Sequence, residues 1–89
     1  MGADFDLGVG WALAPGVALR DEDFGALAYD AATGRVSVLR TAALVALVRA
    51  LADSPTAAQA LGAVADDGSR AALAGALGTL ARQGVLRAR

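Results

Sequence analysis

Apolar and polar residues alternate in three short stretches of the first half of the chain, at residues 17–20, 25–29 and 35–39. Such alternation places successive side chains on opposite faces, which is typical of a half-buried β-strand. Asp30 and Gly34 lie between the last two stretches. The aspartate carboxylate can accept backbone N–H groups, and the glycine can adopt the positive φ of a bulged turn. The pattern therefore predicts a three-stranded antiparallel meander.

The last of these strands allows two registers. If Val36 and Val38 face the core, Ser37 and Leu39 face the other way, whereas the reverse register puts Leu39 in the core. The residues alone leave both open. In either register the strand contains no proline or lysine that would block a further strand from pairing with it. Residues 35–39 are therefore a candidate open sheet edge.

Helical spacing of apolar residues follows directly after the meander. Thr41 is the expected N-cap of a first helix, whose apolar stripe consists of Leu44, Val45, Leu47, Val48 and Leu51. A second helix is predicted to start with Ser54 as its N-cap and Pro55 at its first position, and to run to Val64.

A third helix is predicted over residues 69–83. Leu73, Leu77 and Leu80 recur at helical spacing and are expected first of all in the core. Gly84 follows the last periodic residue, where a glycine in the left-handed conformation commonly ends a helix. The chain thus predicts an α+β fold with three strands followed by three helices.

The length of 89 residues fits one domain, expected over residues 11–89 after a flexible arm at residues 1–10. The start of the chain, residues 1–6, carries two acids and no basic residue, unlike a signal peptide. The most hydrophobic stretch, 41–52, is too short to span a bilayer and is broken by Arg49. We therefore expect a cytoplasmic protein with no membrane partner.

Charge and composition exclude several function classes. Eight arginines nearly balance nine acids and lysine is absent, so the chain lacks the positive field that drives binding to a phosphate backbone. Histidine and cysteine are also absent, which removes the usual metal ligands, the usual general base and the thiol nucleophile. The acidic residues 21–23 are expected to form a solvated loop after the first strand. We expect no enzyme, no metal and no cofactor.

Two other classes stay open. Three helices beside a small sheet could form a winged-helix nucleic-acid-binding module, although the third helix offers only Arg70 and Arg82 to phosphate or base. A small Ala-rich domain with an open strand edge could instead self-associate as a structural module or homodimer.

Four segments carry a resemblance to a known family: W-A-L-A-P-G-V-A-L-R, F-G-A-L-A-Y-D, R-V-S-V-L and an apolar helix ending in R-A-L-A-D. Together they resemble the PqqD-like peptide-recognition elements, and within them the peptide chaperones of the mycofactocin system. The likeness covers residues 11–86 and is strongest over 11–53. It implies a winged-helix-like fold and a non-catalytic role. Such a module binds the leader of a ribosomally made precursor peptide and presents it to a radical SAM maturase.

The same resemblance implies where the leader binds. It would pair as an additional antiparallel strand with the third strand, in the groove beside the third helix. This assigns main-chain pairing to Arg35, Val36, Ser37, Val38 and Leu39. On the third helix the candidate contacts are Arg70, Leu73, Ala74, Leu77 and Ala81, with Arg70 and Arg82 available for acidic leader residues.

Overall fold

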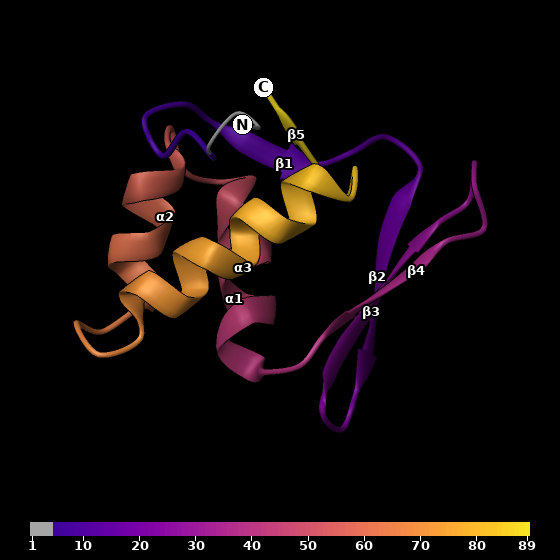
Figure 1. Ribbon diagram of the computed structural model, residues 1–89, viewed down its shortest axis with the longest axis horizontal. Coiled ribbons are helices and arrows are strands. Elements are labelled where there is room, and N and C mark those ends of the chain that lie inside the picture. Colours follow the sequence, from indigo (N-terminus) through magenta and orange to yellow (C-terminus); the bar gives the residue numbers. More distant parts are fainter. Residues whose placement is uncertain (1–4) are drawn as a thin grey trace.

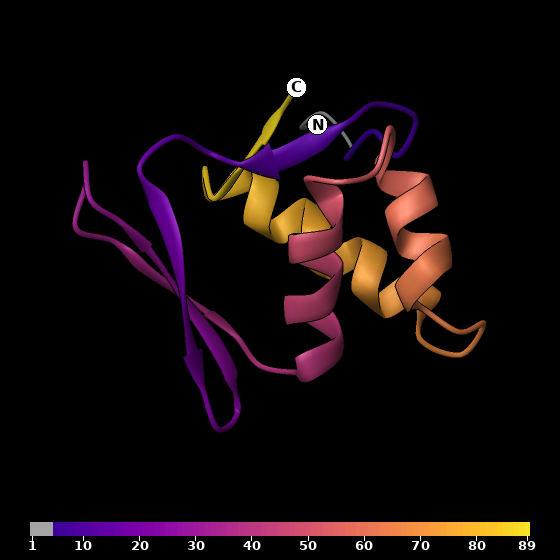
Figure 2. The ribbon, with the colours of Figure 1, turned by 180° about the vertical axis from the view of Figure 1, so that it is seen from behind.

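A three-stranded antiparallel sheet and three helices make up most of the fold, which confirms the predicted α+β class. The computed structural model describes residues 5–89. Figure 1 shows the sheet on one side of the helices, and Figure 2 shows α1 lying between the sheet and α2. The elements in chain order are β1 (Trp11–Leu13), β2 (Val17–Glu22), β3 (Gly25–Asp30), β4 (Val36–Leu39), α1 (Ala42–Leu51), α2 (Ala57–Val64), α3 (Arg70–Arg82) and β5 (Leu86–Ala88).

The sheet has the order β2-β3-β4, so β4 is an edge strand. Its inner face buries Ala26, Ala28 and Leu39, which pack against the helices. Val36 and Val38 point to the opposite face and are 53% and 44% exposed. Of the two registers that the sequence allows, the one with Leu39 in the core is therefore correct.

The turn between β3 and β4 is the predicted one. The Asp30 carboxylate accepts the N–H of Ala32 at 2.9 Å, and the Asp30 carbonyl accepts the N–H of Gly34 at 2.8 Å. Gly34 has a φ of 74°, which favours glycine. This turn fixes how β4 aligns with β3.

The predicted acidic loop at residues 21–23 is wrong in its extent. Asp21 and Glu22 continue β2, and the connection to β3 is a two-residue turn at Asp23 and Phe24. Both carboxylates have a cationic neighbour, with Arg49 2.8 Å from Asp21 and Arg20 3.0 Å from Glu22.

The first helix begins as predicted. The Oγ1 of Thr41 accepts the N–H of Leu44 at 3.1 Å, which caps α1. The predicted apolar stripe is buried at every position: Leu44, Val45, Leu47, Val48 and Leu51.

The predicted start of the second helix is wrong. Thr56, rather than Ser54, is the N-cap of α2, and its Oγ1 accepts the N–H of Gln59 at 3.2 Å. Ser54 instead donates its hydroxyl to the carbonyl of Ala50 at 2.8 Å. The serine thus satisfies the end of α1, and α2 starts two residues later than predicted and ends at Val64 as predicted.

The third helix follows the prediction closely. Gly84 has a φ of 82° just after α3, and the N–H of Val85 donates to the carbonyl of Leu80 at 2.9 Å. At its other end, Ser69 makes no capping bond through its side chain. Hydrogen bonds from the Ser69 side chain and backbone hold the pKa of the Asp66 carboxyl below its usual value.

Sequence reasoning missed the pairing of the two ends of the domain. β1 and β5 form an antiparallel ribbon that lies across the helices (Figure 1). The preceding segment is tied down as well, because the carbonyls of Leu7 and Val9 accept N–H groups of Ala58 and Ala57 at 2.9 Å. The proposed flexible arm, 1–10, begins outside the described residues and stays a prediction. Within the part described, no helix is long and apolar enough to cross a bilayer.

Candidate functional site

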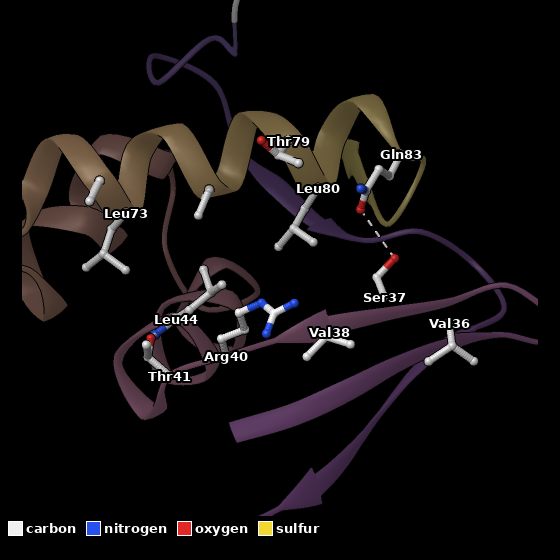
Figure 3. A pocket seen from close by; sticks show the side chains of 12 residues that line it. Val36, Ser37, Val38, Arg40, Thr41, Leu44, Leu73, Thr79, Leu80 and Gln83 are labelled. Atoms are coloured by element: carbon white, nitrogen blue, oxygen red, sulfur yellow. Dashed lines mark hydrogen bonds between the residues drawn. The ribbon is translucent and has the colours of Figure 1, made fainter. Parts of the chain in front are cut away.

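A groove of about 600 Å³ runs between the free edge of β4 and helix α3. Figure 3 shows α3 along one side of it and β4 along the other. The start of α1 closes the end next to the last residue of β4. The lining residues are Val36, Ser37, Val38, Arg40, Thr41, Leu44, Ala72, Leu73, Ala76, Thr79, Leu80 and Gln83.

The backbone of β4 offers free hydrogen-bonding groups to this groove. The N–H of Asp30 donates to the carbonyl of Arg35 at 2.9 Å, which fixes the phase of the β3–β4 ladder. Because antiparallel pairs alternate between bonded and non-bonded, Ser37 and Leu39 direct their backbone groups to β3. Val36 and Val38 direct theirs to the free edge, where another strand can pair with them.

Opposite β4, the groove is lined mainly by apolar side chains, several of them short. Leu44, Leu73 and Leu80 line it and are at most 8% exposed. A bound chain would cover the small part of these side chains that still contacts water. Ala72 and Ala76 have short side chains and leave room above the helix backbone. A groove with polar backbone on one side and an apolar wall on the other suits an extended peptide.

The other end of the groove is polar. The hydroxyl of Ser37 donates to Oε1 of Gln83 at 3.3 Å, which links β4 to the end of α3 (Figure 3). Next to this contact lies a smaller hollow of about 100 Å³, which Arg35 also lines. The groove is thus charged at the Arg40 end, apolar in its middle and polar at the Ser37 end.

Within residues 5–89, Arg40 is the one charged residue that lines the groove. It directly follows β4 and is exposed, and it forms none of the ion pairs found in the described part of the chain. In the same residues no cluster of acidic side chains is placed to hold a metal ion. The arrangement can bind a chain and a negative charge, and it assembles no group of residues for catalysis.

The structure brings only some of the predicted site residues to the groove. Val36, Ser37, Val38 and Leu73 line it, and Arg35 lines the adjacent hollow. The side chain of Leu39 is fully buried in the core. The remaining predicted residues on α3 do not line the groove: Arg70, Ala74, Leu77 and Ala81.

The difference on α3 is one of helical phase. Leu77 is fully buried in the core, and the stripe of Arg70, Ala74, Leu77 and Ala81 lies outside the groove lining. The stripe one position earlier, through Leu73, Ala76 and Leu80, faces the groove instead. The polar residues Thr79 and Gln83 at helical spacing were the available signal for that face.

An edge strand beside an apolar groove is the arrangement by which small peptide-binding modules take up an extended chain. Over residues 10–87 the chain matches the model of the peptide chaperone MftB family, and it belongs to that family. This confirms the resemblance to a peptide chaperone. It also confirms the expectation that the chain is not an enzyme, because a chaperone binds its peptide without catalysis.

Three mycobacterial proteins named peptide chaperone MftB are similar to the chain over most of its length. The one from Mycolicibacterium smegmatis is 44% identical over 84 residues, covering 92% of this chain and 81% of the relative. That from Mycobacterium tuberculosis is 40% identical over 85 residues, covering 94% and 78%. That from Mycobacterium ulcerans is 42% identical over 78 residues, covering 86% and 72%. No solved structure matches significantly.

Proposed function

We propose that this chain binds the leader of a ribosomally made precursor peptide by strand addition to β4, and presents it to a radical SAM maturase in mycofactocin biosynthesis. The maturase would carry out the chemistry, while this chain would hold the leader. Because the precursor is made on the ribosome, we place this step in the cytoplasm. The observation that carries the proposal is the free edge of β4 facing an apolar groove.

The two edges of the sheet differ in what lies beside them. Along β2, Leu19 directs its backbone groups outward, because its neighbours Ala18 and Arg20 pair with β3. Two hollows lie near that edge: one touches β2 at Leu19, and the other touches it at Asp21 and Glu22 beside α1. The groove beside β4 is lined by three consecutive strand residues and by α3. A peptide strand on β4 would therefore gain both backbone pairing and side-chain burial.

The binding residues follow from this placement. Backbone pairing would use Val36 and Val38, within the predicted segment Arg35–Leu39. Alternate side chains of the leader would point toward α3, where Leu73 and Leu80 offer apolar contact. The rest of the precursor would lie outside the groove and stay accessible to the maturase.

The first test has two parts: a search of the genes next to this one, and a peptide titration with the purified protein. We expect neighbouring genes for a short precursor peptide and a radical SAM enzyme. The N-terminal half of that precursor is synthesised and titrated into ¹⁵N-labelled protein, and amide hydrogen exchange is followed. We expect at least tenfold slower exchange at Val36 and Val38, because pairing protects an edge amide. The amide of Leu19 on the β2 edge is the matched control and should not change.

The proposal would be overturned if the peptide bound with no protection at Val36 and Val38, or protected Leu19 instead. If both neighbouring genes were absent, the proposed maturase partner and the proposed role in mycofactocin biosynthesis would be wrong. To test presentation, the purified radical SAM enzyme is assayed with precursor, with and without this chain. An unchanged rate of modification would contradict that part of the proposal.

A further inference from the structure

We infer that Arg40 selects a carboxylate in the bound peptide, so that the ligand is an acidic extended segment with an Asp or Glu at its N-terminal end. This inference rests on the proposed strand addition and adds the chemical class of the ligand. It concerns one residue that lies outside both the predicted strand segment and the predicted helix contacts.

The first argument is charge. Arg40 is the one ionisable side chain along the groove within residues 5–89, and the other lining residues are apolar, hydroxyl or amide groups. Arg20 and Arg49 each have a carboxylate within 3.0 Å, whereas Arg40 has none among the described residues. A guanidinium beside an apolar wall favours an anionic partner, because a charge-assisted hydrogen bond is stronger where water is displaced.

The second argument is position. Arg40 directly follows the last residue of β4, and Figure 3 shows its side chain rising from the strand end into the groove. Thr41, the other polar residue at this end, already accepts the N–H of Leu44 with its hydroxyl. Arg40 supplies the charged donors at this end of the groove, while Ser37 donates to Gln83 at the other end.

The direction of the added strand then determines which peptide residue lies beside which residue of β4. In an antiparallel added strand, the residue beside Arg40 precedes the residues beside Leu39, Val38 and Val36. The residue opposite Leu39 shares the inner face with it and points toward the apolar wall. The expected ligand pattern is therefore an acidic residue followed directly by an apolar one.

The experiment uses a random dodecapeptide library displayed on phage and selected on the immobilised full chain. Wild type, Arg40→Glu, Arg87→Glu and Val38→Pro are run in parallel. Arg87 is the matched control, because it is an exposed arginine on β5 that does not line the groove. On wild type and Arg87→Glu we expect enrichment of Asp or Glu directly before an apolar residue. On Arg40→Glu this enrichment should disappear.

The best selected peptide is then synthesised with its acid and with the matching amide, and both are titrated calorimetrically. We expect the amide version to bind wild type about tenfold more weakly, and both versions to bind Arg40→Gln equally. Equal binding of acid and amide to wild type, or the same acidic enrichment on Arg40→Glu, would overturn the role of Arg40.

The Val38→Pro protein separates this inference from the proposed function. If Val38→Pro loses binding while acid and amide bind wild type equally, strand addition stands and the role of Arg40 falls. If folded Val38→Pro binds as wild type does, strand addition itself is wrong and the inference falls with it. Recovery of no binding peptide from the wild-type protein would overturn both.

Discussion

Ser37 and Gln83 lie 46 residues apart in sequence, yet the Ser37 hydroxyl donates to Oε1 of Gln83 at 3.3 Å and joins β4 to the end of α3. The contact crosses the groove at its polar end (Figure 3). A peptide residue opposite Ser37 would share its inner face and point toward this contact. Binding would therefore exchange the Ser37–Gln83 hydrogen bond for contacts with the peptide.

We expect Gln83→Ala to raise the affinity for the leader about two- to fivefold, because binding no longer breaks an exposed neutral hydrogen bond. The change in free energy of unfolding should stay below about 1 kcal/mol. Calorimetric titration and thermal unfolding measure the two quantities. Gln59→Ala on α2 is the matched control, since Gln59 is exposed and does not line the groove. A loss of affinity in Gln83→Ala would show that Gln83 itself contacts the peptide.

Proline substitutions along β4 should separate folding from binding. Val38→Pro removes an N–H that points to the free edge, so the protein should fold and lose leader binding. Ser37→Pro removes an N–H that points to β3 and leaves a carbonyl of that strand without its partner, so it should lower the free energy of unfolding by about 1–3 kcal/mol. Circular dichroism with thermal unfolding, followed by titration of the folded variants, checks both. The opposite result, with Val38→Pro unfolded and Ser37→Pro stable, would mean that Val38 rather than Ser37 directs its N–H to β3.

Two neighbouring residues of α3 should behave in opposite ways. Leu77 is fully buried, so Leu77→Ala should reduce the free energy of unfolding by about 2–5 kcal/mol and leave the affinity of the folded protein unchanged. Ala76 lines the groove, so Ala76→Leu should fill it and weaken leader binding at least tenfold with little loss of stability. Chemical denaturation and titration distinguish the two effects. Weakened binding in folded Leu77→Ala would return Leu77 to the set of peptide contacts that the sequence predicted.

The local patterns of this sequence predict the elements well and the groove only in part. β4 was recognisable because its alternation, its turn and the cap at Thr41 are all encoded by adjacent residues. The face of α3 that lies toward β4 could not be recognised in the same way. A helix with Ala or Gly at many positions has no sharply defined apolar face, and Leu73, Leu77 and Leu80 do not all lie on one face. Arg40 was missed because it lies between a predicted strand and a predicted cap. The Ser37–Gln83 contact depends on tertiary packing, for which no local signal exists.

The free edge of β4 also makes self-association testable. Two copies could pair β4 with β4 around a two-fold axis, because Val36 and Val38 leave their backbone groups and side chains exposed. We expect the sedimentation coefficient of the wild-type protein to rise with concentration. The Val38→Pro variant should stay monomeric, because one of its edge donors is missing, and saturating leader peptide should dissociate the wild-type dimer by competing for the same edge. A Val38→Pro protein that dimerises as wild type does would place the contact elsewhere. A wild-type protein that stays monomeric throughout would rule the homodimer out.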